Sequence, residues 1–281
     1  MGILPVPSVS TDAVVLRSWP CGETSVIASL LTREYGFIRV LAKAARRPRS
    51  RLRPLVEPGR LLNVDFSMDQ SRELQYLRSG SVDLDPLLAG LSLEQSAFLL
   101  AALELVDRCR PIQAPDGGST PADLFAVCDA YIRMLSSLSD TDPARIFFAF
   151  EWQLLALHGL DPEVESCSSC GKSVAMEENS SGSTGSEGKA LWFSATEGGL
   201  ICGDCGGNSN IGRPLTHGAL GEFSAYDAGT FLNENRMEMN RSLRREVGAH
   251  LHRFLGFHMP GYRLPTALDL LRPIPRVEEN Y

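Results

Sequence analysis

Four cysteines in the second half of the chain have the spacing of metal ligands. They form two matched pairs, each with two residues between the cysteines and a glycine after the second: Cys167-Ser-Ser-Cys170-Gly171 and Cys202-Gly-Asp-Cys205-Gly206. This spacing lets both sulfurs of a pair turn toward one ion, and the glycine lets backbone amides point at the sulfurs. Four thiolates complete the tetrahedral shell of structural zinc and leave no position for a catalytic water. We therefore expect one structural Zn²⁺ per chain, bound by Cys167, Cys170, Cys202 and Cys205.

Other interpretations of these cysteines stay open at this point. The same ligands could bind iron, and the pairs could instead be redox-active or free thiols. The separation between the pairs exceeds the usual interval, but the low-complexity segment 177–189 accounts for about a dozen of the intervening residues. Residues 191–202 predict a β-hairpin with Gly198-Gly199 at its turn, as in a zinc ribbon.

The histidines suggest no catalytic metal site. None of the five is followed two residues later by glutamate, as the H-x-E motif of a zinc deaminase requires. His250 and His252 could form a metal-binding pair, but side chains two residues apart on a helix diverge. We interpret these two residues as part of a solvated helix face, and we identify no catalytic residue.

A second cluster, at residues 43–53, is strongly basic, and we call it the basic turn. Its density of like charge suits a phosphate backbone, and its preference for arginine favours bidentate phosphate contact and base stacking. An acidic protein, an anionic lipid surface or plain solvation are the alternatives. Tyr35 and Phe37 could add a stacking surface at the same end, although Phe37 could equally belong to the core. The predicted DNA-binding residues are Lys43, Arg46, Arg47, Arg49, Arg51 and Arg53.

The overall acidity of the chain hides this cluster. The formal net charge is −7, but residues 1–80 hold 12 basic and 7 acidic residues, a net of +5, and residues 81–281 hold 15 and 27, a net of −12. With 43% hydrophobic and 22% charged residues, the composition is that of a globular protein. There is no secretory signal, and the apolar run 97–103 is far shorter than the ~20 residues of a membrane span. We expect a cytoplasmic protein without disulfides.

The segments that must position these clusters differ between the two parts of the chain. Residues 10–83 predict five short strands separated by Gly and Pro, which is the size of an OB-fold barrel; an SH3-like barrel is the alternative. The expected strands are 11–18, 23–34, 37–44, 60–68 and 72–82.

From residue 92 the pattern becomes helical. A capping box at Ser92–Gln95, a Thr120-Pro121 start, an Asp142-Pro143 start and the segment 238–255 predict four helices. The isolated Cys109 and Cys128 are expected in the core. The fold class is therefore α+β: an OB-fold domain at 1–83, then a helical domain at 84–281 that carries a zinc-binding insertion at 164–212.

Several segments together resemble the RecO family of bacterial recombination mediators. They are TDAVVLRSWPCGETSVIASLLTREYGFIRVLAKAARRPRSRLRPLVEPG, FFAFEWQLLALHGLDPEVESCSSCGK, GGLICGDC and LRREVGAHLHRFLGF. The similarity extends from about residue 10 to 270 in the expected order. One departure lies in the basic turn, where Ala44 replaces a usual glycine, so that the backbone there could differ.

The resemblance implies a non-enzymatic DNA-repair protein of the nucleoid. Such proteins bind single- and double-stranded DNA, anneal complementary strands and, with RecR, help to load RecA onto DNA coated by single-stranded-DNA-binding protein (SSB). The family's pocket for the acidic SSB tail lies in the helical region, where Arg241, Arg244 and Arg245 are candidates, although they could equally form a solvated helix face. A metal-dependent enzyme acting on nucleic acid and a protein-interaction adaptor are the alternative functions.

Overall fold

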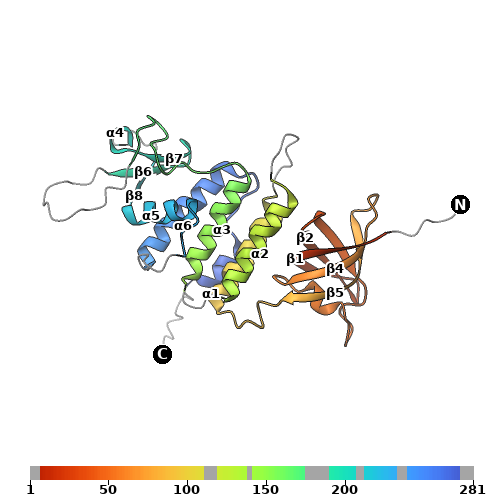
Figure 1. Ribbon diagram of the computed structural model, residues 1–281. Coiled ribbons are helices and arrows are strands. Elements are labelled where there is room, and N and C mark those ends of the chain that lie inside the picture. The colour runs from red at the N-terminus through yellow and green to blue at the C-terminus, as the bar shows by residue number, and fades with distance from the viewer. Residues whose placement is uncertain are drawn as a thin grey trace, which may run out of the picture. The chain divides into compact units, whose positions relative to one another are not determined.

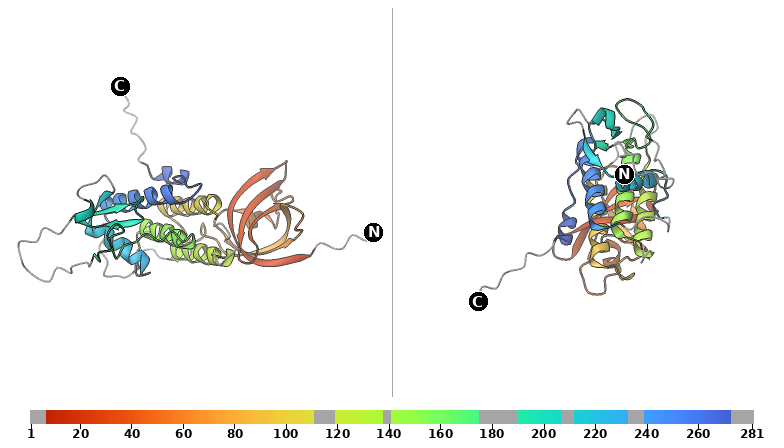
Figure 2. Two further views of the ribbon diagram at one scale, coloured as in Figure 1. Left: turned by 90° about the horizontal axis from the view of Figure 1, so that it is seen from above. Right: turned by 90° about the vertical axis from the view of Figure 1, so that its left-hand side faces the viewer.

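The computed structural model describes residues 7–110, 119–137, 141–174, 190–206, 212–232 and 239–272. The chain forms two compact units, and their helices and strands are drawn in Figures 1 and 2. Unit 1 comprises Met1–Pro143 and Arg263–Tyr281, and unit 2 comprises Ala144–Tyr262. The low-complexity segment 177–189 lies outside the described residues. Within the described ranges, no helix is long and apolar enough to cross a membrane.

Unit 1 begins with a closed five-stranded barrel of strand order β1-β2-β3-β5-β4. Neighbouring strands are antiparallel except β3 and β5, which are parallel. This is an OB-fold topology, as predicted. The strands are β1 (Ser8–Cys21), β2 (Ser25–Thr32), β3 (Gly36–Ala42), β4 (Leu61–Ser67) and β5 (Leu74–Leu84).

The barrel closes because β1 is long enough to pair on both sides. Its first half pairs with β4, its second half pairs with β2, and the register shifts between Val15 and Arg17. Such a bulge bends a strand and increases its twist. Small, branched and aromatic residues then fill the interior, including Ala28, Val40 and Phe66.

Unit 1 also contains the helices α1 (Leu93–Arg108) and α2 (Pro121–Ser137). The predicted capping box is present, since Ser92 and Gln95 bond reciprocally, and the Thr120 hydroxyl accepts from the backbone N–H of Asp123. Cys109 and Cys128 are buried as predicted, and burial raises the pKa of Cys109 to about 11.

The 3₁₀ helix η2 (Thr266–Leu271) also belongs to unit 1, although it lies far along the sequence. The Glu104 carboxylate of α1 accepts hydrogen bonds from the backbone N–H groups of Thr266 and Ala267 and from the Thr266 hydroxyl. These contacts close a loop across more than 160 residues.

Unit 2 combines helices with a small sheet of strand order β7-β6-β8. A cluster of stacked and tilted rings forms its centre, in which Phe223 lies 5.5 Å from Trp152 and 5.0 Å from Phe193. The elements are α3 (Pro143–Leu157), β6 (Leu191–Ser194), β7 (Gly199–Ile201), α4 (Gly203–Gly206), β8 (Arg213–Leu215), α5 (His217–Asp227) and α6 (Arg241–His258).

Two contacts to buried carboxylates connect the helices of unit 2. Arg145 of α3 bonds Glu222 of α5 through two nitrogens, each 3.0 Å from a carboxylate oxygen, and the Tyr226 hydroxyl donates to the same carboxylate. His252 of α6 lies 3.4 Å from Glu151 of α3, whose side chain is fully buried.

The expectation that His250 and His252 form a solvated helix face is wrong. His250 is 4% exposed and lies edge-on to Phe193 and Phe223, and His252 faces the buried Glu151. Packing on both sides of α6 buries His250 and half-buries His252, although their side chains diverge as helix geometry requires.

Candidate metal centre and nucleic-acid interface

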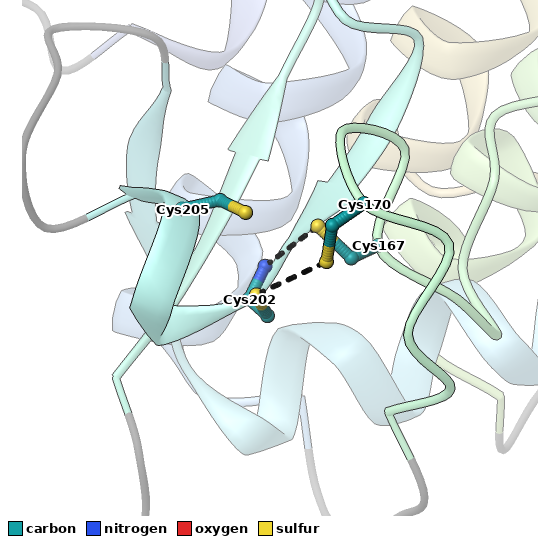
Figure 3. Close-up of side chains that lie close together, drawn as sticks. All are labelled: Cys167, Cys170, Cys202 and Cys205. Atoms are coloured by element: carbon teal, nitrogen blue, oxygen red, sulfur yellow. Dashed lines mark hydrogen bonds between the residues drawn. The ribbon is translucent and has the colours of Figure 1, made fainter.

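The four predicted metal ligands come together in unit 2 (Figure 3). Cys167 and Cys170 come from the segment that follows α3, Cys202 follows β7, and Cys205 lies in α4. All four sulfur atoms are within 4.8 Å of one another. The Cys170 and Cys202 sulfurs are 3.8 Å apart, which matches the edge of about 3.8 Å of a tetrahedron with metal–sulfur bonds of about 2.3 Å. The donor set and its spacing therefore fit a metal ion.

Hydrogen bonds also prepare the cluster for metal binding. Burial by itself would raise the pKa of Cys167, but backbone N–H groups, including that of Cys202 at 3.3 Å, lower this pKa to about 6. Contacts with the Cys170 and Cys202 thiols raise the pKa of Cys205 to about 12. Metal binding requires thiolates, and Cys167 is the cysteine whose surroundings favour that form most clearly.

The two glycines after the cysteine pairs have different roles. Gly171 has a φ of 71°, the left-handed conformation expected of a knuckle glycine. Gly206 has no such φ; it is buried against Trp192, where a Cβ atom would lie 2.5 Å from the ring. The predicted hairpin is present, with Ser194 of β6 opposite Gly199 of β7.

The six predicted DNA-binding side chains are all exposed on the barrel. They follow β3 and continue into the short 3₁₀ helix η1 (Arg53–Val56). Within the part of the chain that the structure describes, none of the six has an acidic group within ion-pair distance. By contrast, Arg33 pairs with Asp12, and Arg60 pairs with Asp85 at 2.5 Å. Unneutralised positive charge therefore concentrates in the basic turn.

The basic turn has a defined backbone. Ala44 and Arg49 have φ values of 59° and 61°, which are left-handed conformations. The Ala44 N–H faces the Ser25 hydroxyl at 3.4 Å, and the Arg46 N–H donates to the Thr24 carbonyl at 2.8 Å. Ala44 thus adopts a conformation natural to glycine, and these contacts hold the basic turn against the β1–β2 loop.

Tyr35 and Phe37 do not lie at the same end of the barrel as the basic turn. Gly36 pairs with Thr32 at one end of the β2–β3 hairpin, and Ala42 pairs with Val26 at the other. Six residues of strand separate these ends by roughly 20 Å. Phe37 instead lies beneath the Arg110 guanidinium at 4.3 Å. The predicted shared stacking surface is therefore wrong.

Sequence reasoning missed two aromatic residues at the end where the basic turn lies. The Lys43 ammonium is 4.6 Å from the ring centre of Tyr76, and the Arg17 guanidinium is 4.8 Å from that of Trp19. Only the pairing of β3 with β5 places Tyr76 here. The Trp19 position follows from the β1–β2 register, which the turn at residues 22–24 could have indicated.

Comparisons with known proteins agree with this architecture. Residues 6–83 match the family model described as recombination protein O N terminal, and residues 91–267 match recombination protein O C terminal. The protein from Pelotomaculum thermopropionicum named DNA repair protein RecO is 28% identical over 88% of each chain. A protein of the same name from Exiguobacterium sibiricum is 28% identical over 90% of this chain and 94% of its own. The chain belongs to the RecO family of DNA repair and recombination proteins.

Proposed function

We propose that this protein is a recombination mediator that binds single- and double-stranded DNA through the basic turn and anneals complementary strands. With RecR, it promotes the loading of RecA onto SSB-coated DNA. The observation that supports this most strongly is the set of six exposed cations on an OB-fold barrel. Each phosphate that such a cation neutralises releases counterions, which drives binding independently of base sequence.

Annealing follows from the same electrostatics. Arginines of the basic turn contact the phosphates of two strands and reduce their mutual repulsion. Phosphate contacts leave the base edges free to pair. Residues 81–281, with a net charge of −12, repel DNA and so restrict it to the barrel. The mechanism requires no bond chemistry, and the protein is not an enzyme.

We infer that the cysteine cluster holds one structural Zn²⁺. Four thiolates fill its coordination shell, so the ion acts by joining the segment that follows α3 to the β7–α4 turn. A hydrolytic metal needs an open position for water. The donor set thus favours a folding role over the alternative of a metal-dependent nuclease or deaminase.

The SSB tail is the proposed acidic partner. Arg241 and Arg245 at the start of α6 are exposed, and Arg244 is half-buried. Their charge complements an acidic peptide. A pull-down with full-length SSB and with SSB lacking its last residues tests this contact, and equal recovery of both forms would contradict it.

Strand annealing tests the proposal as a whole. The variant Arg46→Glu, Arg47→Glu, Arg49→Glu should lose annealing of complementary oligonucleotides and loading of RecA on SSB-coated DNA in the presence of RecR. The matched control, Arg213→Glu, Arg263→Glu, Arg272→Glu, makes the same charge change at exposed arginines elsewhere and should retain both. Survival of annealing in the first variant, or equal loss in both, would contradict the assigned surface.

A further inference from the structure

Four apolar side chains form a row across the outside of the barrel. Trp19 of β1 is opposite Ile27 of β2, Ile27 is opposite Leu41 of β3, and Leu41 is opposite Tyr76 of β5. Directly opposed residues point to the same face of a sheet. With about 4.8 Å between strands, the row extends over roughly 14 Å.

This row faces outward, because its neighbours along each strand face inward. Ala28, Val40, Ala42 and Leu77 flank the row in sequence and belong to the barrel core. Side chains alternate between the two faces of a strand. All four members of the row are only half-buried, so two aromatic and two aliphatic side chains remain accessible on one sheet face.

Positive charge borders the row on both sides. On one side the basic turn begins, with Lys43 against Tyr76. On the other side Arg17 contacts Trp19, and Arg39 is exposed.

A cavity of about 330 Å³ lies next to Arg39. Its lining includes Phe37 and Arg110. Two acidic groups face this region: Glu73 lines the cavity, and Asp107 contacts Arg17, Arg110 and Ser29. The cations Arg17, Arg39, Lys43 and Arg110 outnumber these two, and the basic turn adds to the excess.

We propose that the row of Trp19, Ile27, Leu41 and Tyr76 is a stacking platform for the unpaired bases of a single strand, with the bordering cations holding its phosphates. The proposal rests on the proposed function and assigns single-stranded nucleic acid to this part of the surface. Every unpaired base offers a π-face to an aromatic ring, whereas a duplex buries those faces in its own stack. In the free protein Arg17 lies over the Trp19 ring and Lys43 lies over the Tyr76 ring. A base therefore either displaces the cation or is sandwiched between the ring and the cation.

The test compares single-stranded and duplex oligonucleotides that carry the same number of phosphates. The variant Trp19→Ala, Tyr76→Ala should bind single strands about five- to 150-fold more weakly for each ring removed. It should bind duplex as the wild type does and keep the salt slope of single-strand binding, because stacking releases no counterions. The conservative variant Trp19→Phe, Tyr76→Phe should restore single-strand affinity. The matched control Tyr35→Ala removes a ring from the opposite end of the barrel and should leave the affinity for both single strands and duplex unchanged.

Other outcomes would overturn the proposal. Equal weakening of duplex and single strands, no weakening of either, or failure of the phenylalanine variant to recover would each exclude stacking. The proposal would also be excluded if the binding of a polyglutamate peptide of matched charge depended on Trp19 and Tyr76 as strongly as the binding of single-stranded DNA does. If the wild type bound neither form of DNA, the proposed function itself would fail; if it bound both and only the selectivity were missing, the platform alone would fail.

Discussion

Replacing Ala44 with glycine should stabilise the barrel. Ala44 has a φ of 59°, and the left-handed region costs a residue with a Cβ atom about 1–2 kcal/mol. Glycine removes this cost but adds freedom to the unfolded chain, which offsets about 0.4–1 kcal/mol. The net gain is therefore about 0.5–1 kcal/mol.

Amide hydrogen exchange measures this gain in the barrel separately from unit 2. In peptides from β1 to β4, exchange through barrel opening should be about two- to fivefold slower in Ala44→Gly, because exchange rates follow the opening free energy. The matched control is Ala45→Gly. Ala45 is 1% exposed in the barrel core and has an ordinary φ, so its replacement should accelerate exchange. Faster exchange in Ala44→Gly, or the same sign of change in both variants, would refute the conformational argument.

The remaining predictions concern unit 2. Protein purified under reducing conditions should contain one zinc ion per chain, and Cys167→Ser should lower both the metal content and the stability of unit 2; elemental analysis that found neither zinc nor iron would contradict this. Burial lowers the pKa of His252, but Glu151 raises it more, so that the folded pKa exceeds the unfolded value of about 6.5. The stabilisation by this pair is therefore complete below that pH and is lost as pH rises through the folded pKa; Glu151→Gln should flatten the pH dependence of unfolding, and an unchanged dependence would count against the pair. Arg145→Met removes the bidentate bond to buried Glu222 and should cost about 3–5 kcal/mol in denaturant unfolding, most of which Arg145→Met with Glu222→Leu should recover; a double variant no more stable than the single one would argue otherwise.

Local patterns in the sequence predicted most of the architecture. The five strands follow from two-residue periodicity between Gly and Pro, and the starts of α1 and α2 follow from Ser92 and Thr120, whose side chains bond the first turn. The cysteine cluster was predictable because C-x-x-C spacing is itself a geometric constraint. In each case the determining interaction is local in the chain.

Features that depend on distant pairing could not be predicted. The closeness of Tyr76 to Lys43 requires the parallel β3–β5 pair, and the attachment of η2 to Glu104 requires contact across more than 160 residues. The burial of His250 likewise depends on aromatic residues from other elements. Closeness in sequence to the basic turn predicts the wrong end of the barrel for Tyr35, because the length of β3 separates the two.

The salt dependence of DNA binding tests the central claim most directly. If Arg46, Arg47 and Arg49 each neutralise one phosphate, replacing all three with alanine should reduce the slope of log affinity against log salt by about 2.7 for duplex and about 2.1 for single strands. At 0.1 M salt, the duplex change corresponds to a loss of affinity of between two and three orders of magnitude. A wild-type protein that binds DNA with a slope left unchanged by the three substitutions would show that DNA does not bind at the basic turn.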